Sequence, residues 1–147
     1  MRTETLIRSM NTLIRTNMEA HKGYKRAAKN IADPEISTTL ETMAEKHRTY
    51  ATDLSEVVDD MGGKPRDRST MLGKFHDGWR NLEALLTNGD ASMLIDECVK
   101  GEKAAIKNYR EALRHPIPDG IIEMVWDQYD TIKATTQKLE VIRNDAI

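Results

Sequence analysis

Glu102 is the residue of this sequence that is best placed for a chemical role, because it falls on the apolar face of a predicted helix. Across residues 94–113, apolar side chains such as Ile95 and Tyr109 recur at the three- and four-residue steps of one helix face. Glu102 lies in the same series. A carboxylate on that face must be paired, protonated or bound to a ligand, since an isolated buried charge is costly. The pattern therefore predicts a polar layer inside a helical core.

Other polar side chains interrupt the apolar faces of the remaining long helices near their midpoints. If four such helices pack side by side as two hairpins, the midpoints near residues 17, 47, 102 and 130 meet at one level. Helical bundles build metal and cofactor sites at such a level, from side chains on facing helices. The side chains expected to converge with Glu102 are Asn17, His21, His47 and Gln128.

The strongest form of such a site is a carboxylate-bridged di-iron centre, which needs a Glu-x-x-His pair from each of two helices. No Glu in the sequence is followed by a His three residues later, so the ligand count disfavours a di-iron oxidase. A single metal ion held by His21, His47 and Glu102 is the weaker form, and this ligand set suits zinc or iron.

The favoured interpretation is a structural polar layer. Here the histidines and Asn17 hydrogen-bond Glu102 and either Tyr24 or Tyr109, and the layer fixes how the helices align. This interpretation assigns no catalytic residue, leans against an enzyme and requires no cofactor. Iron or zinc remains the cofactor of the alternative.

The other reactive side chains carry weaker signals. Glu19, Glu41 and Glu45 lie off or beside the apolar faces, so they are expected in solvent. Cys98 is the only cysteine, and a thiol on an apolar helix face is usually an inert core residue.

Breakers and caps divide the chain into the helices that must position these residues. Asp33-Pro34 ends one helix and starts the next, Gly62-Gly63 ends the second, and Asp90 is a good N-cap for the central helix. A shorter helical pattern, with apolar Met71, Leu72, Phe75, Trp79 and Leu82, connects the two hairpins. The long helices are predicted at about 3–31, 34–61, 94–113 and from about 119 onward.

Composition agrees with one helical domain spanning 1–147. Hydrophobic residues make up 39% and charged residues 31%, while strand-forming aromatics reach only 5%. The net charge is -2 and the basic residues are dispersed, which argues against a nucleic-acid partner. We expect no signal peptide and no membrane association, and a cytoplasmic location.

With the helices assigned, the sequence resembles a bacterial family of ferritin-like four-helix-bundle proteins classed as a domain of unknown function. The resemblance rests on segments that span nearly the whole chain. They are Gly23-Tyr24-x-x-Ala27-Ala28, Asp33-Pro34, Leu54 to Gly63, Gly78-Trp79-x-x-Leu82, and Gly101-Glu102 followed by Tyr109-x-x-Ala112-Leu113. The resemblance implies an all-α, ferritin-like antiparallel four-helix bundle with a short crossover helix, and no assigned activity.

The chain also departs from that family's pattern. Members often carry an acid just before the Gly-Glu pair and a His in the last helix, where this chain has Val99 or Lys100 and Thr136. Acids common near His21 are replaced as well. Because each change removes a potential ligand, we expect a non-enzymatic binding or stress-associated module with a degenerate metal site. The alternatives are a reduced iron or zinc site related to oxidative stress, and association as a homo-oligomer or with a protein partner.

Overall fold

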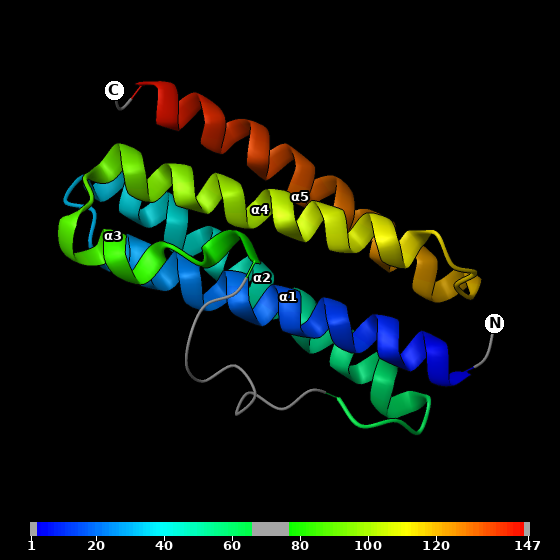
Figure 1. Cartoon of the computed structure of the whole chain (residues 1–147). Coiled ribbons are helices and arrows are strands. Elements are labelled where there is room, and N and C mark those ends of the chain that lie inside the picture. Colours follow the sequence, from blue (N-terminus) through cyan, green and yellow to red (C-terminus); the bar gives the residue numbers. More distant parts are fainter. Residues whose placement is uncertain (1–2, 66–76, 146–147) are drawn as a thin grey trace.

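The computed structural model describes residues 3–65 and 77–145, and its secondary structure within these ranges is helical throughout (Figure 1). Four long helices and a short crossover make up the fold. The long helices are α1 (Thr3–Lys29), α2 (Pro34–Asp60), α4 (Ala91–Leu113) and α5 (Asp119–Asp145). The crossover contains the 3₁₀ helix η2 (Asp77–Trp79) and the α-helix α3 (Leu82–Asn88).

The helix ends follow the predicted capping chemistry. The Asp33 carboxylate accepts hydrogen bonds from the backbone N–H groups of Glu35 and Ile36, at 2.9 and 3.3 Å. Gly62 takes a positive φ of 77° directly after α2, a conformation that glycine adopts without steric cost. The Asp90 carboxylate accepts from the N–H of Met93 at 2.9 Å and starts α4. All three boundaries confirm the sequence prediction.

The long helices form two antiparallel hairpins. The α1–α2 and α4–α5 pairs pack most extensively, α1 and α4 join the hairpins, and α2 touches α5 much less. Figure 1 shows the α4–α5 pair lying along the α1–α2 pair. Within the described residues, no helix combines the length and the apolar character needed to cross a membrane.

The crossover packs against the hairpins through Trp79 and Leu82, which are both buried. Arg26 of α1 pairs with Glu83 of α3 at 3.2 Å, and η2 lies against α4. The other apolar residues of the predicted connector, Met71, Leu72 and Phe75, lie outside the described residues.

The apolar core is divided into two clusters along the bundle. One contains Tyr24, Leu40 and Ile95, and the other contains Leu13, Leu54 and Tyr109, among others. Between them, α1 presents Asn17, α2 presents His47 and α4 presents Glu102. On α5 the gap between the clusters, from Ile132 to Leu139, falls at Thr136.

Two predicted exposures are corrected. A strict seven-residue step along the last helix predicts Thr135 on the buried face, but Thr135 is half-buried and Thr136 is the buried residue, because a 3.6-residue turn drifts from that step. Glu19 was expected in solvent, but it is buried. It lies one turn before Gly23, and the crossover covers Gly23. Helix periodicity alone does not include that extra layer.

Candidate functional site

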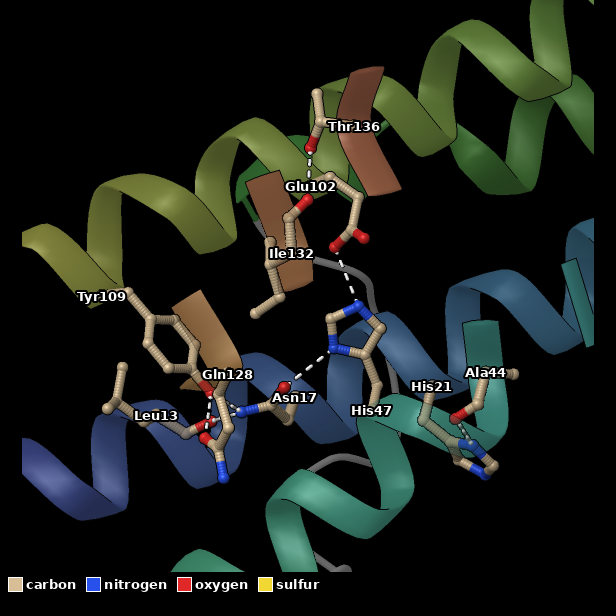
Figure 2. A network of polar contacts seen from close by, with 10 residues as sticks. All are labelled: Leu13, Asn17, His21, Ala44, His47, Glu102, Tyr109, Gln128, Ile132 and Thr136. Atoms are coloured by element: carbon tan, nitrogen blue, oxygen red, sulfur yellow. Dashed lines mark hydrogen bonds and ion pairs between the residues drawn. The ribbon is translucent and has the colours of Figure 1, made fainter. Parts of the chain in front are cut away.

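Five polar side chains form a buried cluster in the middle of the bundle, which we call the polar cluster (Figure 2). Each of the four long helices contributes at least one member, so the cluster links both hairpins. Every member is at most 3% exposed. The polar cluster consists of Asn17 on α1, His47 on α2, Glu102 and Tyr109 on α4, and Gln128 on α5.

A continuous chain of short hydrogen bonds joins these side chains. His47 lies in the middle, with Nε2 at 2.8 Å from Glu102 Oε1 and Nδ1 at 2.8 Å from Asn17 Oδ1. Asn17 Nδ2 donates to the Tyr109 hydroxyl at 2.7 Å, and that hydroxyl donates to Gln128 Oε1 at 2.6 Å. The predicted hydrogen-bonded layer is therefore present, and Gln128 reaches it through Tyr109.

The directions of these bonds fix the proton on one nitrogen of His47. Asn17 Nδ2 also donates to the Leu13 carbonyl at 2.8 Å, and a carbonyl can only accept. The Asn17 oxygen must therefore face His47, so Nδ1 carries a proton and donates it. One further proton lies between Nε2 and Glu102 Oε1, either as an imidazolium–carboxylate pair or as a neutral pair.

Tyr24 stacks against the polar cluster without a hydrogen-bond partner of its own. Its ring lies 5.6 Å from the His47 ring at an interplanar angle of 19°. Burial, and then the negative charge of Glu102, raise the pKa of its hydroxyl. Among the described residues, three buried polar side-chain atoms lack partners: the Tyr24 hydroxyl, Glu102 Oε2 and Gln128 Nε2.

His21, the third predicted metal ligand, does not reach the other two. Its Nδ1 lies 2.9 Å from the Ala44 carbonyl, and Figure 2 shows its ring apart from the His47–Glu102 pair. Among residues 3–65 and 77–145, no group of three or more His, Cys, Asp and Glu side chains is arranged to hold a metal ion. The geometry therefore brings Glu102 and His47 together and leaves His21 apart.

Thr136 is the residue of α5 that lies between the two core clusters. Its hydroxyl donates to the Ile132 carbonyl at 2.9 Å, so it satisfies its own helix and no member of the polar cluster (Figure 2). The last helix therefore offers neither an imidazole nor a carboxylate between the two core clusters.

Trp79 of the crossover packs between α1 and α4 beside the polar cluster. Its indole fills a slot between two glycines, since a Cβ at Gly23 or Gly101 would lie 2.4 or 2.0 Å from the ring. The indole edge meets Tyr24 at 5.1 Å between ring centroids. Gly78 also lies against the backbone of α4, where a Cβ would be 2.1 Å from the Lys100 carbonyl oxygen. Close packing of the crossover on α1 and α4 therefore explains why Gly23, Gly78 and Gly101 all lack a side chain.

Glu97 is a buried acid that the sequence analysis did not single out. Its Oε2 accepts from the Asn81 N–H at 2.7 Å, at the start of α3. Burial raises the pKa of this carboxyl, and the Asn81 bond acts in the opposite direction. Its position in the helical pattern of α4 does not distinguish it from a solvent-exposed acid. Its hydrogen-bond partner, the Asn81 N–H, is supplied by the crossover.

Cys98 is fully buried, as predicted for a core residue. Burial, followed by the charge of Glu102, raises the pKa of the thiol well above its usual value. The thiol is therefore protonated at neutral pH and is a poor nucleophile and a poor metal ligand.

Three comparisons with known proteins place this geometry in context. A family model described as "Domain of unknown function (DUF2383)" matches residues 5–115. No curated protein matches the sequence. The structure of a dodecameric thioferritin, the bacterioferritin-related protein from Bacteroides fragilis, is similar with a TM-score of 0.72 at 20% identity, over 99% of this chain and 85% of that chain. This similarity confirms the predicted ferritin-like bundle fold.

Proposed function

The chain belongs to the family described as a domain of unknown function (DUF2383), and we propose that it is a non-enzymatic, ferritin-like binding or stress-associated module. In this proposal the polar cluster holds the four helices in register and performs no reaction. The family and the fold support the ferritin-like assignment, and the hydrogen bonds of the polar cluster support a structural role for it.

The observation that carries the proposal is the engagement of both His47 nitrogens. Nδ1 donates to Asn17, and Nε2 shares a proton with Glu102, so neither nitrogen has a lone pair free for a metal ion. A ferritin-like fold implies iron, but the donors here do not fit an iron pair. Glu102 Oε2 is the one unpartnered carboxylate oxygen of the cluster.

A reduced metal site is the second candidate function. It is favoured by that same unpartnered Glu102 oxygen and by the adjacent Tyr24 hydroxyl, because buried polar atoms without partners often mark an unrecorded ion or water. In this candidate a single iron or zinc ion would displace the proton between Glu102 and His47, and His21 would have to turn toward them.

Elemental analysis of protein purified without chelator distinguishes the two functions. The structural proposal predicts far less than one iron or zinc per chain, in the wild type and in Glu102→Gln alike. One metal ion per wild-type chain that is lost in Glu102→Gln would support the metal site instead. Glu123→Gln, on the exposed face of α5, is the matched control.

We further propose that the chain works as a homo-oligomer in the cytoplasm. The support is the fold shared with a protein that is described as dodecameric. Light scattering across a dilution series tests this proposal, and a mass equal to one chain at all concentrations would contradict it.

A further inference from the structure

One groove on the outer face of the α4–α5 hairpin is lined by basic side chains that form no ion pair with any described residue. It has a volume of about 400 Å³, and its lining includes Lys103, Ile106 and Arg110 of α4 and Lys133 of α5. Glu140 is the one acid of its lining, and it lies 3.9 Å from Arg143. We call Lys103, Ile106, Arg110, Lys133 and Glu140 the basic groove.

A buried tyrosine holds two of the cations in place. Arg110 Nε donates to the Tyr129 hydroxyl at 3.0 Å, and Lys133 Nζ lies 5.2 Å from the centre of the Tyr129 ring. Tyr129 is 6% exposed, so its position is fixed by the core. The neighbouring Trp126 is 45% exposed and packs edge-on against Tyr129 at 5.5 Å. The groove is therefore preorganised for an anionic group beside an exposed aromatic ring.

The opposite charge is concentrated at the end of α2. Residues 49–63 contain four acids and no Lys, Arg or His. Two of these acids fall in the last turn of α2, which has no basic residue, and carboxylates there oppose the negative end of the helix dipole. The arrangement is unfavourable within one chain, and a cation from outside the chain would relieve it. We call these acids, Asp53, Glu56, Asp59 and Asp60, the acidic end.

We propose that the basic groove of one chain binds the acidic end of a second copy. The two surfaces are complementary in charge, and none of their charged groups except Glu140 has an ion-pair partner among the described residues. Each copy carries both surfaces, so the contact is head-to-tail and generates a ring, a cage or a filament. This inference rests on the proposed self-association and is independent of the role of the polar cluster.

A pair of charge-reversal variants tests the contact. The groove variant is Lys103→Glu with Lys133→Glu, and the end variant is Asp59→Lys with Asp60→Lys. All four side chains are exposed, so both variants should fold, which far-UV circular dichroism would verify. Sedimentation velocity at low and high salt then measures the assembly. We expect each variant alone to require at least about tenfold higher concentration for half-assembly than the wild type.

Mixing the two variants gives the decisive result. In a head-to-tail contact, the reversed groove fits the reversed end and the two unaltered surfaces still fit each other, so an equimolar mixture should assemble while neither variant does alone. Lys29→Glu with Lys138→Glu makes the same charge change as the groove variant outside both surfaces, and this control should assemble like the wild type.

Three results would overturn the proposal. A wild type that is a single chain at every concentration removes the self-association itself. Assembly that neither variant weakens leaves self-association intact and excludes this contact. A mixture that stays dissociated, while the groove variant alone loses binding of a polyglutamate peptide, assigns the groove to a different acidic partner.

Discussion

The Glu102–His47 pair shows how one acid can be accommodated in an apolar core. The pair is buried on both sides, and each partner compensates the desolvation of the other. The chain of bonds through Asn17 and Tyr109 extends this compensation to all four helices. At the scale of single residues, the polar cluster therefore behaves as one unit, and its members should not respond to substitution independently.

Truncation of Glu102 should destabilise the fold strongly. Glu102→Ala leaves His47 Nε2 without a partner in the core, and the expected loss is about 3–5 kcal/mol of unfolding free energy. Glu102→Gln retains the shape and can donate a proton to Nε2, so its loss should be below about 1.5 kcal/mol. Urea unfolding followed by circular dichroism measures both, and a loss in Glu102→Gln as large as that in Glu102→Ala would contradict the expected rescue by the amide.

Glu97 should make stability depend on pH in the direction opposite to a salt-bridged acid. Its raised pKa means that folding favours the protonated form, so this contribution is present at low pH and is lost as the pH rises through the folded-state pKa. Glu97→Gln keeps an acceptor for the Asn81 N–H and removes the burial of charge. We expect it to stabilise the protein at pH 7 by up to about 1 kcal/mol, because Asn81 and nearby Lys100 already offset part of the cost.

The comparison of melting temperatures from pH 4 to pH 8 checks this sign. The difference between Glu97→Gln and the wild type should shrink toward pH 4. The exposed Glu123→Gln serves as the matched control and should show no such trend. A difference that grows toward acidic pH would contradict the assigned direction.

At the scale of elements, the long helices supply every member of the polar cluster, and the crossover supplies Trp79, which packs beside it. Trp79 is held between α1 and α4, and Glu97 of α4 binds the backbone at the start of α3. These two attachments hold the crossover against the hairpins, and Trp79 packs on Tyr24, the stacking partner of His47. The crossover therefore separates the polar cluster from solvent on this side.

An alanine at Gly101 should disrupt this attachment. The added Cβ would lie 2.0 Å from the Trp79 indole, so the ring must move, at a cost of about 1–3 kcal/mol. The control is Gly120→Ala in the first turn of α5, where nothing lies within 4 Å, and it should be neutral or stabilising by up to about 1 kcal/mol.

A double-substitution cycle identifies the cause of the loss. Combining Gly101→Ala with Trp79→Leu should cost less than the sum of the two single changes, since the smaller side chain leaves space for the Cβ. Additive losses would indicate that Gly101 is required for some other reason.

The sequence predicts the helices and the Glu102–His47 pair but not the contacts of the crossover. Helical periodicity and caps determine which residues share a face, and this places Asn17, His47 and Glu102 at one level. The partner of the buried Glu97 depends on where a short, glycine-containing connector docks, which no periodicity encodes. His21 was expected inside because it flanks the seam of its helix, but its ring lies against the carbonyl of Ala44.

At the scale of the whole molecule, a ferritin-like bundle is combined with a central layer whose imidazole is fully hydrogen-bonded. The two apolar clusters on either side provide the core, and we propose that the layer between them fixes the register of the helices. In this account the interior gives stability and specificity, while the charged outer surfaces, the basic groove and the acidic end, mediate association.

Thermal unfolding with and without metal tests the central claim most directly. Any ion that binds the native cluster and not the unfolded chain must raise the melting temperature, and the stabilisation grows with the logarithm of the ion concentration once that concentration exceeds the dissociation constant. If the polar cluster is structural, then anaerobic ferrous iron, zinc and a chelator should each leave the wild-type melting temperature unchanged. A melting temperature that rises with metal and falls with chelator, with both effects absent in Glu102→Gln, would contradict the account.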